Sequence, residues 1–168
     1  MSAVAHPKTG LCPFLPADAP MLAEIFRAAI EELTADDYTE AQREAWASAA
    51  ADETDFAARL GNQLTLIGTL DGSPLGFISL AASEQIDMLY VHPAAAGQGI
   101  GAMLFDAVEK LARSRGASRL TVDASDNASG FFQHRGFVAQ QRNTVLRGDE
   151  WLANTTMEKK LTAKESAS

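Results

Sequence analysis

The chain has 168 residues, of which 46% are hydrophobic and 21% are charged, a balance typical of a globular protein with one sizeable core. Fourteen basic and 22 acidic residues give a formal net charge of −8, and no segment forms a local basic patch that reverses it. Because this charge repels phosphate backbones and anionic lipids, we expect a protein that binds neither nucleic acid nor membranes.

Cys12 is the single cysteine, so an intramolecular disulfide is excluded and a reducing, cytoplasmic location is expected. No stretch approaches the ~18 consecutive apolar residues of a membrane span, and Met1–Gly10 lacks the apolar core of a signal peptide. We expect a single domain over residues 1–168, with a flexible lead-in at 1–10 and a flexible tail at 162–168.

The first third of the chain is predicted to be helical. Apolar residues at helical spacing follow an Asp-x-Pro start signal and predict a helix over Ala19–Leu33. A second helix is expected after Thr39, and a third begins near Asp55 and ends at Gly61.

The remainder alternates strands and helices, with a turn signal at Asp71–Pro74 between the first two strands. Strands are predicted at Leu64–Leu70, Leu75–Leu80, Ile86–Val91, Leu120–Val122, Phe137–Leu146 and Trp151–Lys160, and helices at Ile100–Arg115 and Ala128–His134. This order indicates a mixed α/β or α+β fold with at least one crossover helix.

Gly97-Gln98-Gly99-Ile100-Gly101 joins a predicted strand to the start of a predicted helix. Glycines let the backbone turn tightly and approach a ligand, and the first-turn N–H groups of the helix favour an anion. The loop has neither the Gly-Lys-Ser/Thr of a P-loop nor the spacing of a dinucleotide fingerprint. By itself, it is explained equally well as a tight connection without a ligand.

Two motifs together give the chain a resemblance. Leu89-Tyr90-Val91-His92-Pro93 with the glycine loop and Leu104, followed by Ser125–Phe137, resembles the two motifs of the GCN5-related N-acetyltransferase (GNAT) superfamily. The resemblance spans roughly Leu11–Leu161, and short further stretches are similar to little-characterised bacterial members.

The resemblance implies a GNAT fold, a twisted and mostly antiparallel sheet of about six to seven strands that is splayed at strands 4 and 5 and flanked by about four helices. It implies acetyl-CoA as the cofactor, with its pyrophosphate on the loop and its pantetheine arm along the edge of the strand that holds Leu89 and Val91. The residues expected to bind it are Leu89, Tyr90, Val91, Ala96, Gly97, Gln98, Gly99, Ile100, Gly101, Ser125, Ala128, Phe131 and Phe132.

Two positions depart from the superfamily pattern. Ala96 stands where the loop usually opens with Arg or Gln, so backbone N–H groups are expected to hold most of the pyrophosphate. Phe132 stands where many members carry a tyrosine that protonates the departing thiolate. A thiol pKa of about 8.5 makes thiolate a tolerable leaving group without such an acid, so catalysis is not excluded.

Acyl transfer to an amine also needs a base and a stabilised oxyanion. Backbone N–H groups around Tyr90 are expected to polarise the thioester carbonyl. Asp87 is the first candidate base and Asp123 the second, although a structural role explains Asp87 equally well. A loop role is favoured for His92, and His134 is expected to face solvent or CoA. The histidines and the cysteine show no metal-ligand spacing, so no metal is expected.

The acceptor is expected to meet the first two helices and the last hairpin. Acidic and aromatic residues in these segments would suit a cationic amine. They are Glu31, Glu32, Asp36, Asp37, Tyr38, Trp46 and Trp151. A solvated acidic helix end with Trp46 in the core is the simpler explanation of their presence. The leading hypothesis is acetyl transfer from acetyl-CoA to an amine of a small molecule or protein. Transfer to oxygen, use of a longer acyl group, and a CoA-binding module without turnover stay open, as does a homodimer.

Overall fold

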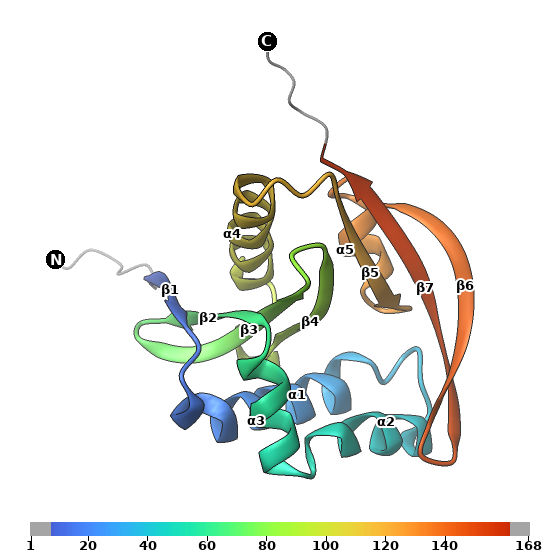
Figure 1. Ribbon diagram of the computed structural model, residues 1–168. Coiled ribbons are helices and arrows are strands. Elements are labelled where there is room, and N and C mark those ends of the chain that lie inside the picture. The colour runs from blue at the N-terminus through green and yellow to red at the C-terminus, as the bar shows by residue number, and fades with distance from the viewer. Residues whose placement is uncertain (1–7, 162–168) are drawn as a thin grey trace, which may run out of the picture.

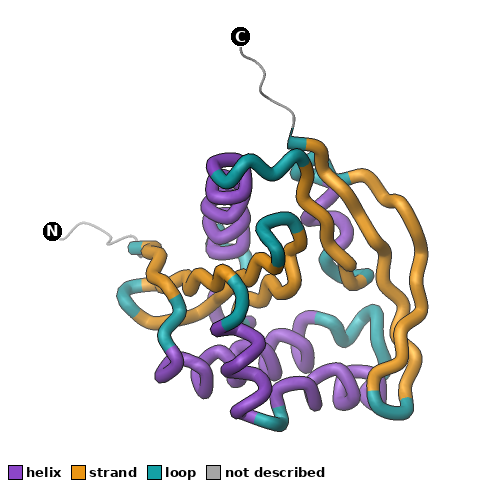
Figure 2. The backbone as a smooth tube through the Cα atoms, viewed as in Figure 1, coloured by secondary structure: helices purple, strands orange, loops and turns teal. Residues whose placement is uncertain are grey.

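The computed structural model describes residues 8–161, which form one seven-stranded sheet with helices on both faces (Figures 1 and 2). The strand order is β1-β2-β3-β4-β5-β7-β6, and all neighbours are antiparallel except β4 and β5. The strands are β1 (Thr9–Pro13), β2 (Leu64–Leu70), β3 (Ser73–Ala81), β4 (Gln85–Val91), β5 (Arg119–Ser125), β6 (Val138–Arg147) and β7 (Glu150–Lys160). The helices are α1 (Ala19–Leu33), α2 (Glu40–Ala47), α3 (Glu53–Gly61), α4 (Ile100–Ser114) and α5 (Ser129–Gln133).

The helices divide between the two faces and give the molecule two apolar cores. Figure 1 shows α1, α2 and α3 below strands β2 to β4, with α4 on the opposite face. The core under α1 and α3 includes Phe26, Phe56 and Phe77, whereas Leu104 and Phe105 of α4 pack in the other core. None of the described helices is long and apolar enough to cross a membrane.

The predicted helices form because their ends carry the right residues. α1 has the predicted bounds, and α2 begins at a capping box in which the Thr39 hydroxyl accepts from the Gln42 N–H at 3.1 Å. α3 begins two residues earlier than the prediction because the Asp52 carboxylate caps it, accepting from the Asp55 N–H at 3.0 Å.

Strand β1 was not predicted, and the expectation of a flexible lead-in over 1–10 was wrong for Thr9 and Gly10. Both residues pair with β2, opposite Leu70 and Thr69. β1 is a short edge strand with a glycine and a proline, which hides its strand character from sequence patterns. Residues 1–7 and the predicted tail at 162–168 lie outside the described residues.

The β6–β7 hairpin is long enough to reach the helices on the far side of the molecule. Figures 1 and 2 show it descending along one side until its turn lies beside α2. The Gln42 side-chain amide in α2 donates to the Trp151 carbonyl at 2.7 Å, and a Cβ at Gly148 would lie 3.7 Å from that of Ala45. The turn of the hairpin is therefore fixed against α2.

Helix α4 lies unusually close to the sheet because glycines face it. A Cβ on Gly76 would lie 2.8 Å from Cγ2 of Ile100, and one on Gly68 would lie 3.0 Å from the same atom. Ile100 is the first residue of α4, so these contacts also fix the end of the glycine loop.

We predict that Gly76→Ala lowers the free energy of unfolding by about 1–3 kcal/mol, because the added methyl group overpacks the sheet against Ile100. Gly61→Ala is the control, since a Cβ there meets nothing within 4 Å. Denaturant unfolding measures both variants. Equal midpoints for the two would show that the packing under α4 has room to relax.

Candidate active site

The parallel pairing of β4 and β5 is limited to one end of the strands. Gln85 pairs with Thr121 and Ile86 with Val122, and beyond these pairs the strands separate. β5 stays paired with β7 as far as Ser125. A cavity of about 60 Å³ lies in the gap, here called the splay cavity, and its lining includes Leu89, Ala124, Ser125, Ala128 and Phe132.

The glycine loop follows β4 at the open end of the splay. Gly97 and Gly99 have φ values of +80° and +85°, a conformation that other residues adopt only with strain, and Cβ atoms there would meet nothing within 4 Å. Unlike α2 and α3, α4 has no side-chain cap at its N-terminus. Its first-turn N–H groups therefore have no side-chain acceptor among the described residues, an arrangement that suits an anion.

The two sequence motifs meet beside this loop. A Cβ at Gly101 would lie 3.6 Å from the ring of Phe131 and 3.7 Å from the side chain of Val91, so α5 packs next to the start of α4. The Arg135 guanidinium lies 3.7 Å from the centre of the Phe131 ring. The side-chain amide of Gln98 donates to the Ala94 carbonyl at 3.3 Å.

A second cavity, of about 230 Å³, lies on the side of the sheet that α1, α2 and α3 cover, and is here called the helix-side cleft. Its walls come from these helices and the segments between them, from β4 and β5, and from the strand ends that flank the turn of the β6–β7 hairpin. It meets the splay cavity at six shared residues: Trp46, Ile86, Asp87, Tyr90, Asp123 and Ser125. A ligand entering along the splay and another from the helix side would therefore meet there.

Asp87 lies at this junction because β4 bulges. Met88 pairs with Ser79 and Ile86 with Leu80, which leaves Asp87 without a partner on β3. Its carboxylate accepts two hydrogen bonds from Arg59, at 2.8 and 2.9 Å, and one from Gln63 at 2.8 Å.

These bonds decide the charge of Asp87. Burial alone would raise the pKa of its carboxyl, but the hydrogen bonds from Arg59 and Gln63 outweigh burial and hold the pKa below its usual value. A carboxylate held in this way is a weak base, and its geometry fits the structural role better than the role of first candidate base.

Asp123 lies on the opposite side of the junction, on β5. Its carboxylate accepts a hydrogen bond from the Thr156 hydroxyl at 2.6 Å, and it forms no ion pair with any of residues 8–161. Asp123 is exposed and lines both cavities. Of the two predicted carboxylates, it is the one without an ion-pair partner among the described residues.

Tyr90 places a hydroxyl at the same junction. Its oxygen accepts a hydrogen bond from the Trp46 indole N–H at 3.1 Å, and its ring packs against Phe26 and Phe77. Burial raises the pKa of Tyr90 to about 12, against the opposing effect of the Trp46 hydrogen bond. The hydroxyl is therefore a neutral donor at physiological pH.

Phe132 brings no polar group to the splay. It is buried in an aromatic cluster with Phe105, Phe131 and Phe137, with ring centres 5.1 to 6.4 Å from its own. His92 caps the turn before the glycine loop, where its Nδ1 accepts from the Ala94 N–H at 3.0 Å. His134 is exposed at the end of α5.

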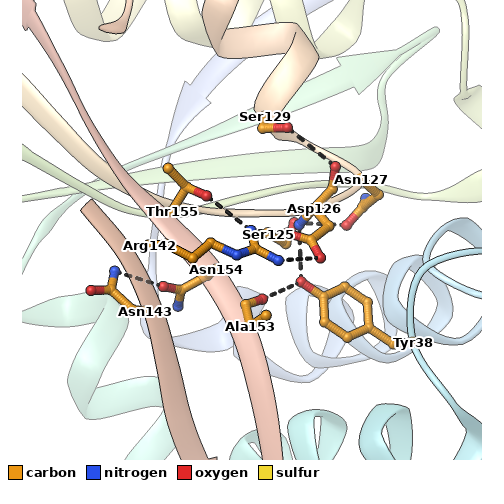
Figure 3. Close-up of polar contacts among 10 residues, drawn as sticks. All are labelled: Tyr38, Ser125, Asp126, Asn127, Ser129, Arg142, Asn143, Ala153, Asn154 and Thr155. Atoms are coloured by element: carbon orange, nitrogen blue, oxygen red, sulfur yellow. Dashed lines mark hydrogen bonds and ion pairs between the residues drawn. The ribbon is translucent and has the colours of Figure 1, made fainter. Parts of the chain in front are cut away.

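A polar network at the carboxyl end of β5 joins segments that are far apart in the sequence (Figure 3). The Tyr38 hydroxyl donates to the Ala153 carbonyl at 2.6 Å and accepts from the Asp126 N–H at 2.9 Å. Arg142 of β6 pairs with the Asp126 carboxylate and donates to the Thr155 hydroxyl at 3.0 Å. Burial raises the pKa of Tyr38, so its hydroxyl keeps the proton that the network needs.

The structure brings the side chains of the predicted residues Asp87, Tyr90 and Asp123 together at the junction of the two cavities, whose linings include no residue of the glycine loop. It adds three residues that the sequence did not single out. These are Arg59 and Gln63, which hold Asp87, and Arg147, which lines the helix-side cleft. No sequence signal marks them, because their roles depend on the bulge and on the docking of the hairpin.

Comparison with known proteins agrees with this geometry. Residues 34–161 match the acetyltransferase (GNAT) domain family, and the chain belongs to it. The class of enzyme is therefore N-acetyltransferase. The chain is 31% identical over 144 residues to the uncharacterized N-acetyltransferase YafP of Escherichia coli (strain K12), across 86% of this chain and 91% of YafP.

Solved structures of similar fold include the following two. A GCN5-related N-acetyltransferase from Rhodopseudomonas palustris is 61% identical, with a TM-score of 0.90 over 96% of this chain and 99% of that chain. The PaiA N-acetyltransferase of Thermoplasma acidophilum, in complex with coenzyme A, has a TM-score of 0.75 at 21% identity, over 91% of this chain and 99% of that chain. The second likeness concerns the fold alone.

The raised pKa of Tyr90 predicts a loss of stability at alkaline pH. Tyrosine in the unfolded chain ionises near pH 10.0, whereas Tyr90 in the folded chain ionises at about 12. The contribution of Tyr90 to the free energy of unfolding is therefore fully present below pH 10 and is lost as the pH rises through about 12. Urea unfolding between about pH 8 and about pH 11 should show a shallower decline for Tyr90→Phe than for the wild type. Equal slopes would mean that Tyr90 ionises normally.

Proposed function

We propose that the chain transfers an acetyl group directly from acetyl-CoA to an amine of a small molecule or protein. The observation that carries this proposal is the junction of two cavities that are both lined by Asp123, a carboxylate without an ion pair among the described residues, and by Tyr90 of the strand that leads to the glycine loop. The similarity in fold to PaiA, whose structure is in complex with coenzyme A, supports the choice of cofactor.

The residues present fit acetyl-CoA. The backbone amides of Ala96 to Gly101 would hold the pyrophosphate, since the loop is glycine-rich and no side chain caps α4. The unpaired edge of β4 at Leu89 and Val91 would pair with the pantetheine arm. Ser125, Ala128 and Phe132 would form the opposite side of the splay, and Phe131, which packs beside Gly101, would lie at the start of α4.

The bound cofactor would supply a thioester carbonyl for the amine nitrogen to attack, with the C–N bond forming as the C–S bond breaks. Asp123 would take the proton that the amine must lose, directly or through water. The backbone N–H groups around Tyr90 and the Tyr90 hydroxyl would donate hydrogen bonds to the charge that develops at the junction. Because Trp46 already donates to Tyr90, this hydroxyl has its own proton free to offer.

The proposal gives each predicted carboxylate a different part. Asp87 would position Arg59 and the bulge of β4, and Asp123 would act on the amine. Phe132 removes the tyrosine that the superfamily pattern would supply, so a module that binds CoA without turnover is the alternative that the experiments must exclude.

The conformation of the glycine loop is expected to determine the affinity for the cofactor. Gly99→Ala should lower the affinity for CoA about tenfold or more, because alanine at φ +85° strains the loop and moves its amides. Gly72→Ala is a matched control, since Gly72 has the same φ of +85° in the β2–β3 turn. Calorimetry measures binding and thermal unfolding measures stability. Similar stability losses with similar CoA affinities would remove the loop from the binding site.

The second prediction concerns turnover. The wild type should release free thiol from acetyl-CoA only when an amine is present, and Asp123→Asn should lower kcat/KM by about 100-fold or more, at unchanged affinity for CoA. Asp106→Asn, an exposed carboxylate on α4, is the control and should be fully active. Binding of CoA without thiol release from any amine would favour the module, and full activity of Asp123→Asn would exclude Asp123 as the base.

A further inference from the structure

The charged side chains that line the helix-side cleft do not neutralise one another completely. They are Arg59, Asp87, Arg147 and Asp123. Arg59 and Asp87 form an ion pair at 2.8 Å and neutralise each other. Arg147 and Asp123 form no ion pair with any of the described residues. The cleft therefore offers one separate positive charge and one separate negative charge to a ligand.

The hairpin fixes the backbone of Arg147, while the guanidinium has no charged partner among the described residues. It is the last residue of β6, next to the turn that docks on α2 through Gln42 and Gly148. Within residues 8–161, its guanidinium donates a single hydrogen bond, to the carbonyl of the neighbouring Leu146 at 3.2 Å. Its charge acts on both Asp87 and Tyr90, which lie on β4. The guanidinium thus faces the cleft with most of its donors unused.

The acidic residues that the sequence offered for a cationic acceptor lie elsewhere. Among the lining residues of the cleft, Tyr38 and Trp46 are present, but the acidic residues at the end of α1 and in the turn after it are absent: Glu31, Glu32, Asp36 and Asp37. An acceptor that carries only positive charge would meet Asp123 but would also meet Arg147. The arrangement of charge thus favours an acceptor with both signs.

We propose that the acceptor is a small aminocarboxylate, whose carboxylate binds Arg147 while its amine lies towards Asp123. This inference rests on the proposed function for the reaction but not for the binding. A guanidinium matches a carboxylate in geometry and can form two parallel hydrogen bonds with it. The cleft volume of about 230 Å³ suits a compound of amino-acid size.

The test uses acceptors in matched sets, in which one amine carries a carboxylate, the corresponding primary amide, or neither group. The wild type should acetylate the aminocarboxylate with a kcat/KM about 10- to 100-fold above that of the amide, because a charge-assisted hydrogen bond contributes more than a neutral one. A set of different chain lengths between the amine and the carboxylate finds the spacing that the cleft accepts.

Variants of Arg147 make the assignment specific. Arg147→Gln should raise KM for the aminocarboxylate about tenfold or more and leave the amide unchanged, while Arg147→Lys should recover part of the loss. Arg147→Glu should reverse the preference, favouring a diamine over the aminocarboxylate. Arg115→Gln is the control, because it removes the same charge from an exposed position at the end of α4.

Binding to the CoA-saturated protein, measured by calorimetry, separates this inference from the proposed function. If the aminocarboxylate binds in an Arg147-dependent way but releases no thiol in the assay with acetyl-CoA, the inference is supported and the reaction is rejected. Acetylation of amines at rates that ignore both the carboxylate and the residue at position 147 would support the reaction and overturn the inference. Absence of aminocarboxylate binding to both wild type and Arg147→Gln would overturn it as well.

Discussion

Strand β5 pairs with β7 over seven residues but with β4 over only two, and the two halves of the sheet share little backbone hydrogen bonding. This limited pairing leaves one edge of β4 unsatisfied along Leu89 to Val91, and a buried polar backbone is costly unless something pairs with it. The splay cavity, the position of the glycine loop and the junction of the two cavities all follow from the divergence of these strands.

Side chains hold together what the sheet leaves apart. Tyr38 connects the segment after α1 to both β7 and the start of the loop before α5, and Trp46 of α2 reaches Tyr90 of β4. Gln42 ties α2 to the hairpin. These contacts connect α2 and the segment after α1 to both halves of the sheet. The distance between β4 and β5 is therefore set by packing and side-chain hydrogen bonds.

Much of this arrangement could be predicted from the sequence, because its signals are local. The apolar stripe and terminal glycine of α4, the capping box of α2 and the two motifs each depend on residues close together in the chain. The splay was predicted only through the resemblance, and the sheet confirms it.

The rest depends on register and on distant contacts. β1 is short and contains a glycine and a proline, so it looks like a loop until β2 pairs with it. The candidacy of Asp87 as a base changed because a bulge aims it at Arg59, 28 residues earlier in the chain. Arg147 gave no sequence signal, because its place in the cleft exists only once the hairpin turn rests on α2.

The docked hairpin also has a consequence for how such a protein can change. The strands, loop and helices around the splay form one continuous stretch from Gln85 to Gln133, whereas the helix-side cleft is completed by segments before and after that stretch. The hairpin contacts α2 through the Trp151 carbonyl and Gly148, so these contacts do not depend on the side chains with which the hairpin lines the cleft. Evolution or design can therefore change the selectivity for the acceptor through the hairpin residues that line the cleft, without changes in the segment around the splay.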